Sequence, residues 1–350
     1  MISEDLVRQA LATVPYPGFK RDIVSFGLVK AVHIGEDRDV TVVMEVATKD
    51  PQVPEAIYTK TRAALDPLPG IGNVQIDLNV KEPEQQQAEG LGQSSIPGVK
   101  QILAVASGKG GVGKSTVATN LAVSLAEQGK RVGLCDCDLY GPSAALMFGS
   151  DDELRATSEN QIVPHRLHGV HVVSMGFLLS DTSPVIVRGP IATRYIQQFL
   201  RQVAWPDLDF LVLDLPPGTG DVQLTIVQTV AVDGALIVTT PQEVALIDAR
   251  KASSMFAKVN VPVWGLVENM SYFLCPDNGQ EYPIFGRGGG EREAKRLGVP
   301  LMGRLPLEPA VREGGDEGVP VVLRKKGGMA AQVFREIASG ILEKSYEKVS

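Results

Sequence analysis

A glycine-rich segment in the middle of the chain carries residue types that bind phosphate. Residues 107–116 read SGKGGVGKST and contain the pattern G-x-x-x-x-G-K-S. The segment follows the apolar run QILAVA and opens a helical pattern, which is the context that this motif needs. Glycines let backbone N–H groups surround phosphate oxygens, and the start of the helix adds a positive dipole end. The predicted nucleotide-binding residues are Gly108, Lys109, Gly110, Gly111, Val112, Gly113, Lys114, Ser115 and Thr116.

Two side chains of this loop have separate predicted roles. Lys114 is placed to bridge the β- and γ-phosphates, and the Ser115 hydroxyl is placed to ligate Mg²⁺. The sequence therefore predicts ATP and Mg²⁺ as ligands and a P-loop ATPase as the enzyme class.

Acidic residues end two apolar runs that follow the loop. Asp136 and Asp138 lie in GLCDCDLYGPS, and Asp214 lies in DFLVLDLPPGTGD. Carboxylates near a phosphate loop can hold Mg²⁺ or orient the attacking water, and Asp214 has the form of the aspartate that holds Mg²⁺. The amide of Gly218, just after Asp214, is a candidate sensor of the γ-phosphate.

The elements that must position these residues form an alternating pattern from Lys100 onward. Near-continuous apolar runs indicate strands of a parallel sheet with helices on both faces. These runs lie at 101–107, 131–138, 209–216, 234–241 and 261–269, and a closing helix over 330–348 places Ala330, Phe334, Ile337 and Ile341 on one face. The predicted fold class is α/β, a parallel-sheet P-loop NTPase domain over residues 100–350.

A small α+β domain is predicted for residues 1–82. Helical patterns cover 4–14 and 54–68, with Leu6, Ala10 and Val14 on one face of the first, and β-rich segments cover 22–34, 39–47 and 73–80. The charged segment GEDRD reads as a hairpin turn. Residues 83–99 are polar, rich in Gln, Gly and Ser, and predict a flexible linker.

Composition excludes several other classes. The net charge is −7 and no block of Lys or Arg stands out, which argues against non-specific nucleic-acid binding. No apolar run approaches the ~20 residues of a membrane helix, and the acidic start is not an export signal. Three cysteines do not make a disulfide scaffold, and Cys135 and Cys137 are expected to pack in the core. The predicted location is the cytoplasm, with neither a membrane nor a nucleic acid as partner.

The loop also resembles that of a known ATPase class. GKGGVGKST is similar to the deviant Walker A motif of the MinD, ParA and nitrogenase iron-protein class. The resemblance implies a homodimer that encloses two ATP molecules, with Lys109 reaching the nucleotide of the other subunit. It assigns water orientation to Asp138, places Asp136 nearer the metal and gives Asn269, in VENMS, contact with the adenine base.

Further motifs resemble the Mrp/ApbC family of ATP-binding iron–sulfur cluster carriers. The resemblance spans nearly all of residues 96–345 and rests on DLYGPS, VSMGFL, VRGP, DLPPGTGDVQLT, ENMSYF and IFGRGGGE. Residues 1–82 resemble the small iron–sulfur assembly domain often fused in front of such ATPases. The resemblance implies that a homodimer delivers clusters to apo-proteins or works with assembly proteins.

The cluster site departs from the family pattern. In the family a C-x-x-C pair follows ENMS, and two subunits together supply four thiolates to one [4Fe–4S] cluster. Here Cys275 fills the first position and Asn278 the second. Three interpretations stay open. Cys275 from each chain can bind a cluster weakly, with further ligands from a partner, a small thiol or solvent. The chain can instead have lost cluster binding, or Cys275 can be an ordinary loop residue.

Two other function classes compete with a carrier. The main alternative is a MinD- or ParA-like nucleotide-switched dimer that acts on protein partners without a cluster. A small-metabolite kinase is disfavoured by Lys109 and by the PPGTGD segment.

Overall fold

The computed structural model describes residues 2–17, 22–35, 37–48, 52–81, 94–159, 161–177, 196–197, 199–275, 277–325 and 328–347. They divide into two units, one up to residue 81 and one from residue 94 onward. The motif VRGP at 187–190 and most of the predicted linker lie outside the described residues. Ser94, within the predicted linker range, pairs with Val230 of the second unit.

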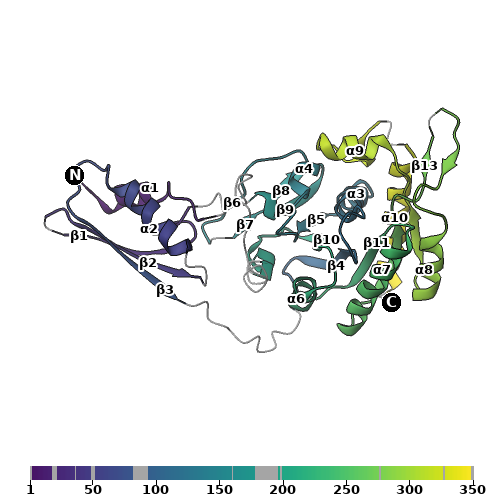
Figure 1. Ribbon diagram of the computed structural model, residues 1–350, viewed down its shortest axis with the longest axis horizontal. Coiled ribbons are helices and arrows are strands. Elements are labelled where there is room, and N and C mark those ends of the chain that lie inside the picture. Colours follow the sequence, from purple (N-terminus) through teal and green to yellow (C-terminus); the bar gives the residue numbers. More distant parts are fainter. Residues whose placement is uncertain are drawn as a thin grey trace. The chain divides into compact units, whose positions relative to one another are not determined.

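An eight-stranded sheet forms the centre of the second unit (Figure 1). Its strand order is β15-β12-β11-β4-β10-β5-β9-β8, and every neighbouring pair is parallel except β8 with β9. The strands are β4 (Val99–Ala106), β5 (Val132–Asp136), β8 (His165–Leu167), β9 (Val170–Ser174), β10 (Leu208–Asp214), β11 (Gly234–Thr239), β12 (Val263–Glu268) and β15 (Leu301–Arg304). The predicted α/β parallel-sheet class is confirmed.

Helices cover both faces of this sheet, which explains the continuous apolar runs. Leu236 and Val238 of β11 pack in one cluster with α3 (Lys114–Glu127) and α10 (Gly328–Glu347), including the four predicted residues of the closing helix. Ile237, between them, packs on the opposite face with α7 (Glu243–Lys258) and α8 (Gly289–Leu297). Successive side chains of a strand point to opposite faces, so both must be apolar here.

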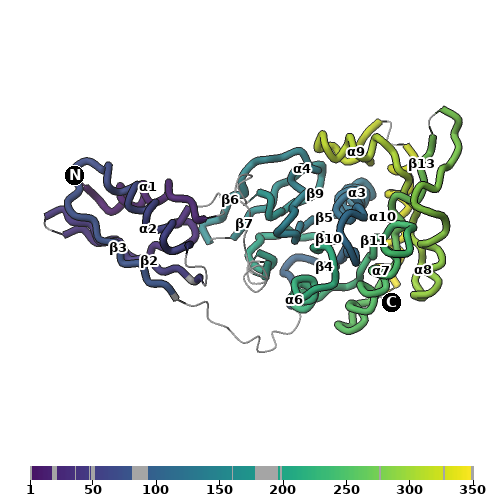
Figure 2. The backbone as a smooth tube through the Cα atoms, in the orientation of Figure 1, coloured from purple at the N-terminus to yellow at the C-terminus, as the bar shows by residue number. Residues whose placement is uncertain are grey.

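Smaller elements complete the second unit. They are α4 (Ala144–Met147), β6 (Arg155–Ala156), β7 (Ile162–Val163), η1 (Met175–Phe177), α6 (Asp221–Thr229), β13 (Phe273–Leu274), β14 (Glu281–Tyr282), α9 (Pro309–Asp316) and η2 (Val321–Leu323). The hairpin that begins with β13 projects from the body of the unit (Figure 2). No helix among the described residues is long and apolar enough to cross a membrane.

The first unit contains a three-stranded sheet and two helices. Its elements are α1 (Glu4–Leu11), β1 (Val29–Ile34), β2 (Val40–Ala47), α2 (Gln52–Leu65) and β3 (Val74–Lys81). β1 and β2 are antiparallel, and β2 and β3 are parallel. The Gly35 amide donates to the Asp39 carbonyl at 2.8 Å, so the predicted hairpin turn between β1 and β2 is confirmed.

Two local predictions in this unit were wrong. The first helix was predicted to reach Val14, but α1 ends at Leu11 because Pro15 stops it. The helix residues that are buried are Val7 and Leu11. The β-rich segment 22–34 forms a strand only from Val29. Its first part turns instead, because the Asp22 carboxylate accepts hydrogen bonds from the amides of residues 24 and 25.

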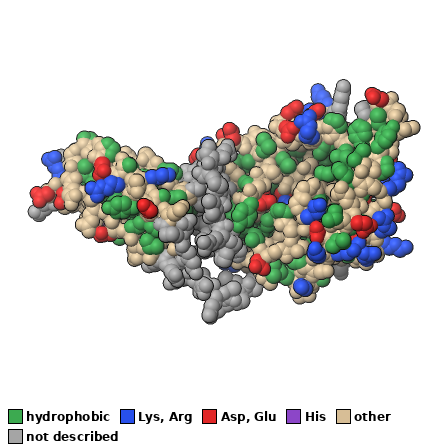
Figure 3. All heavy atoms as spheres, viewed as in Figure 1, with side chains coloured by type: hydrophobic (Ala, Val, Ile, Leu, Met, Phe, Trp, Pro, Cys, Tyr) green, Lys and Arg blue, Asp and Glu red, His purple; other side chains and the backbone are tan. Residues whose placement is uncertain are grey.

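Charged side chains of both signs are mixed on the surface shown in Figure 3.

One ion pair at the start of β10 allows a test of the pH dependence of stability. The Arg131 guanidinium donates to Asp209 at 3.1 Å and holds the pKa of that carboxyl well below its usual range. A lowered folded-state pKa stabilises the fold above the unfolded pKa and loses this effect as pH falls. We expect Asp209→Asn to lower the melting temperature equally from pH 7 to about 4 and by less below that. A difference that grows on acidification contradicts this assignment.

Candidate active site

The phosphate loop joins the end of β4 to the start of α3. Helix α3 begins at Lys114, and Gly113 before it has a φ of 81°, the left-handed conformation that favours glycine. A Cβ atom on Gly108 would clash with the backbone carbonyl of Asp248 in α7. The loop therefore needs glycine both for its turn and for its close packing.

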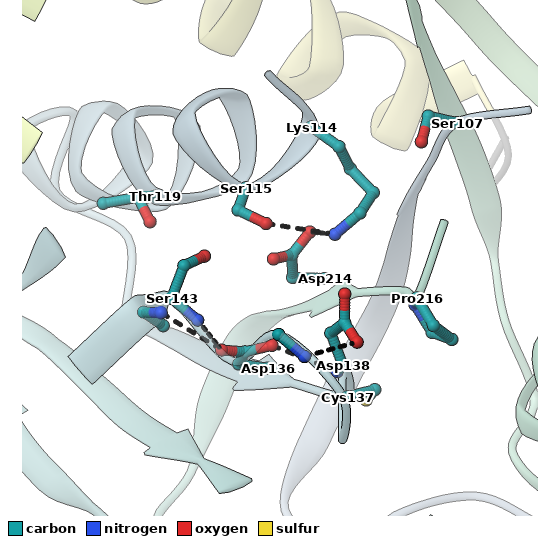
Figure 4. A network of polar contacts seen from close by, with 12 residues as sticks. Ser107, Lys114, Ser115, Thr119, Asp136, Cys137, Asp138, Ser143, Asp214 and Pro216 are labelled. Atoms are coloured by element: carbon teal, nitrogen blue, oxygen red, sulfur yellow. Dashed lines mark hydrogen bonds and ion pairs between the residues drawn. The ribbon is translucent and has the colours of Figure 1, made fainter. Parts of the chain in front are cut away.

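Lys114 lies in a buried polar centre with two other predicted site residues (Figure 4). Its Nζ forms an ion pair with Oδ1 of Asp214 and lies 3.1 Å from Oγ of Ser115. Only 6% of the Lys114 side chain and 1% of the Asp214 side chain are exposed. Burial raises the pKa of Asp214, and the Lys114 ammonium opposes that rise. The structure thus brings the predicted phosphate and Mg²⁺ residues together.

The donor set at this centre fits Mg²⁺. The Ser115 hydroxyl and the Asp214 carboxylate both contact the Lys114 ammonium, and Mg²⁺ prefers such hard oxygen ligands. The Lys114 ammonium already places one positive charge against Asp214.

Asp138 follows β5, the neighbour of β10 in the sheet. Its Oδ1 accepts hydrogen bonds from the amides of Tyr140 and Gly141 at 3.1 and 3.2 Å. The half-buried side chain lines a cavity of about 420 Å³, together with Tyr140, Gly141, Pro216, Pro217, Gly220, Asp221, Val222 and Gln223. The carboxylate predicted to orient water therefore lies at a cavity that is large enough for water. Figure 4 shows Asp138 beside the Lys114–Asp214 pair.

Asp136 is enclosed more completely than the sequence indicates. Its carboxylate is fully buried and accepts four hydrogen bonds at 2.9–3.1 Å, from the amides of Asp138, Ser143 and Ala144 and from Oγ of Ser174. Burial first, and then the Asp214 charge, raises the pKa of Asp136 to about 6. These bonds make Asp136 the anchor of residues 138–144. Ser174 was missed because VSMGFL showed no chemistry of its own.

Other predicted residues lie around the loop. Asn269, at the end of β12, donates from Nδ2 to the Val112 carbonyl at 2.8 Å, so it reaches the nucleotide loop; its contact with adenine stays a prediction. The Gly218 amide donates to the Ser107 carbonyl at 3.0 Å. Lys109 is half-buried, and the described residues provide no ion pair for its ammonium.

Cys275 directly follows β13 and opens the turn of the β13–β14 hairpin. Its backbone pairs with Gln280 and Gly279, and its side chain is partly exposed. Asn278 is used inside the turn, where its Oδ1 accepts the Gln280 amide at 2.9 Å and its Nδ2 donates to the Tyr282 hydroxyl at 3.2 Å. Within the described part of the chain, no three His, Cys, Asp or Glu side chains gather as a metal site. One protomer alone therefore cannot provide a Cys₄ set.

Cys135 and Cys137 are packed in the core, as predicted. Both side chains are fully buried, and their sulfur atoms lie 3.8 Å apart. Their mutual hydrogen bond and their burial raise the pKa of the Cys137 thiol well above its usual value. A thiol held neutral in this way is a poor metal ligand.

Most of the chain matches two protein families, and it is similar to named relatives over nearly its whole length. Residues 98–342 match the family described as NUBPL iron-transfer P-loop NTPase, and residues 4–78 match a family described as iron–sulfur cluster assembly protein. A protein named iron–sulfur cluster carrier protein from Deinococcus radiodurans is 45% identical over 335 residues, covering 95% of this chain and 93% of its own. One of the same name from Synechocystis is 43% identical over 351 residues, covering 98% of each chain.

Two solved structures are also similar to this chain. The nucleotide-binding protein of Archaeoglobus fulgidus in complex with ADP has a TM-score of 0.57 and 38% identity, covering 63% of this chain and 87% of its own. The cell-division ATPase MinD of Pyrococcus furiosus has a TM-score of 0.54 and 26% identity, covering 70% and 99%. With its phosphate loop, its carboxylates and these matches, the chain belongs to the NUBPL iron-transfer P-loop NTPase family.

Proposed function

We propose that the chain is an ATP-hydrolysing iron–sulfur cluster carrier that works as a homodimer in the cytoplasm. The observation that carries the ATPase is the buried centre in which Lys114 contacts both Ser115 and Asp214, next to Asp138. Residues 108–116 would surround the phosphates, and Ser115 and Asp214 would hold Mg²⁺, which supplies positive charge against the phosphate oxygens. Lys109 would serve the partner's nucleotide, and Asn269 the adenine base.

The Gly218 amide offers a way for ATP to change the structure. It now donates to the Ser107 carbonyl, the residue that opens the phosphate loop. A γ-phosphate oxygen is a stronger, charged acceptor for the same N–H group. Exchange of one acceptor for the other would move the loop of residues 216–220 with nucleotide state.

The cargo is supported by the family and by the position of Cys275. Related proteins carry the name iron–sulfur cluster carrier, and the first unit matches an iron–sulfur assembly family. Cys275 is partly exposed on the projecting hairpin, where a second copy or a recipient apo-protein can reach it. Two copies provide two thiolates, so additional ligands from a thiol or a partner would complete the cluster.

The ATPase proposal predicts a separable loss in Asp138→Ala. Because Asp138 lines the cavity but lies outside the Lys114–Asp214 pair, ATP binding should persist while kcat falls about 100-fold or more. The measurement is phosphate release against ATP concentration, together with light scattering for the mass of the ATP complex. We expect the variant to accumulate as an ATP-bound dimer.

A matched control is Asp151→Ala, which removes an exposed carboxylate elsewhere in the second unit. It should hydrolyse ATP like the wild type. A wild-type chain that binds ATP but releases no phosphate contradicts the proposed activity. An Asp138→Ala variant with unchanged kcat contradicts only the role of this residue.

A nucleotide-switched dimer without a cluster is the second candidate. The observation that favours it is Asn278, which fills the second cysteine position and is bonded within the turn. Its amide oxygen is a hard ligand that suits iron–sulfur clusters poorly. Iron content after anaerobic reconstitution separates the two candidates.

A further inference from the structure

The cavity beside Asp138 contains a buried polar side chain that the mechanism above does not use. Gln223 lies in the first turn of α6, and only 1% of its surface is exposed to solvent. It lines the 420 Å³ cavity together with Asp138. Buried polar groups are nearly always hydrogen-bonded, so each atom of this amide needs a partner.

The orientation of the Gln223 amide is fixed by one contact. Its Nε2 donates to the carbonyl oxygen of Pro216. A carbonyl oxygen only accepts hydrogen bonds, so the NH₂ group must face Pro216 and Oε1 must face elsewhere. Oε1 is buried and has no hydrogen-bond donor among the described residues. Oε1 is therefore a buried acceptor without a donor in that part of the chain, in a residue that lines the cavity.

The cavity is large enough to hold water. Its volume is more than ten times that of one water molecule, about 30 Å³. The Asp138 carboxylate can accept hydrogen bonds from water in this cavity, and Gly220 and Asp221 at the start of α6 line the same space. Gln223 Oε1 is closed off from it and could accept from a water molecule only after the amide moves. A water molecule needs two to four such partners to be held in place.

We propose that Gln223 is a catalytic residue that holds the attacking water together with Asp138. The proposal rests on the ATP hydrolysis proposed above and deepens it. In the reaction, the water oxygen forms a bond to the γ-phosphorus. The bond to the β,γ-bridging oxygen breaks, and its electron pair stays on ADP. One water proton remains on the phosphate product and the other is released to solvent. Gln223 and Asp138 accept hydrogen bonds from the water and so aim its lone pair at phosphorus.

The contact with Pro216 gives Gln223 a connection to the nucleotide sensor. Pro216 lies two residues before Gly218, whose amide donates a hydrogen bond to the Ser107 carbonyl. A shift of this loop on ATP binding would move the Pro216 carbonyl and with it the amide of Gln223. The acceptor would then reach its working position only when ATP is bound.

The experiment compares Gln223→Met with Gln228→Met in the full chain. Both changes put the same side chain on α6, but Gln228 is exposed and lies outside the cavity. We expect Gln223→Met to lower kcat about tenfold to a hundredfold, with the dissociation constant of a fluorescent ATP analogue within twofold of wild type. Gln228→Met should match the wild type in both.

A second variant separates water holding from loop support. Gln223→Glu keeps an acceptor oxygen but loses the donor to Pro216 at neutral pH. We expect it to retain several-fold more activity than Gln223→Met, and to gain activity as pH falls, since a protonated carboxyl can donate to Pro216 again. Equal losses in both variants assign the effect to the Pro216 contact and overturn the inference.

The remaining outcomes distinguish this inference from the proposed function. Hydrolysis by the wild type together with an undiminished kcat in Gln223→Met overturns the inference alone. A fall in ATP affinity that matches the fall in kcat also overturns it, because the residue then supports binding. A wild-type chain that binds ATP without hydrolysing it removes the proposed function, and this inference with it.

Discussion

Replacement of Lys114 by methionine should abolish ATP hydrolysis and also destabilise the nucleotide-free fold. The Lys114 ammonium is the ion-pair partner of Asp214, whose side chain is 1% exposed. Removing one member of a buried pair leaves the other charge uncompensated and costs about 3 kcal/mol. The same substitution removes the cation that a phosphate loop uses on the β- and γ-phosphates.

The stability effect has a defined pH dependence. Burial already raises the pKa of Asp214, and loss of the ammonium that opposes this rise must raise that pKa further. A carboxyl whose pKa is raised on folding destabilises the folded state increasingly as pH rises above its unfolded pKa. The free energy of unfolding lost by Lys114→Met should therefore be largest at neutral pH and shrink toward pH ~4.

Lys109→Met provides the matched control. It removes the other lysine of the same loop, which is half-buried and has no ion pair among the described residues. This variant should also lose hydrolysis, because the partner subunit's nucleotide lacks its lysine, but it should unfold like the wild type in urea. Equal unfolding free energies for both variants and the wild type would falsify the energetic role of the Lys114–Asp214 pair.

The parts of the site that could be predicted from sequence are those whose chemistry is local. The phosphate loop is one continuous segment, and its glycines, lysines and hydroxyl act where they stand in the chain. Asp214 was predictable because it ends an apolar strand that neighbours β4 in the sheet. The role of such residues can be inferred from the ten residues of sequence that adjoin them.

The parts that could not be predicted depend on contacts between distant segments. Ser174 bonds Asp136 across 38 positions of sequence, and nothing near Ser174 indicates this partner. The strand β15 was missed because its four residues are only partly buried or exposed and show no apolar run. Gln223 lay within a quoted motif, but its burial and its free acceptor appear only once α6 is placed beside Asp138.

Restoring the second cysteine should have the largest effect on the cargo. We expect Asn278→Cys to raise iron content after anaerobic reconstitution to about four per dimer, with strong thiolate-to-iron absorption in the visible range. Two such chains supply four thiolates, whereas the wild type supplies two. The substitution exchanges a hard amide for the soft ligand that iron–sulfur clusters require.

The hairpin can accept this change at a modest structural cost. Asn278 is exposed, and its two side-chain bonds, to Gln280 and Tyr282, lie within the same turn. The backbone bond from the Gly279 amide to the Cys275 carbonyl, at 2.9 Å, does not involve the Asn278 side chain. Positions 275 and 278 therefore stay on one short turn, as a C-x-x-C pair needs.

Three further variants make the result specific. Cys275→Ala should hold no cluster, and Cys275→Ala combined with Asn278→Cys should hold no more than the wild type, since each copy then again offers one thiolate. Asn278→Ser removes the amide without adding a thiolate and should leave iron content unchanged. Four irons per dimer in the wild type, lost in Cys275→Ala, would mean that borrowed ligands suffice. An Asn278→Cys chain without iron would show that the hairpins of two copies do not meet, and would favour the switch over the carrier.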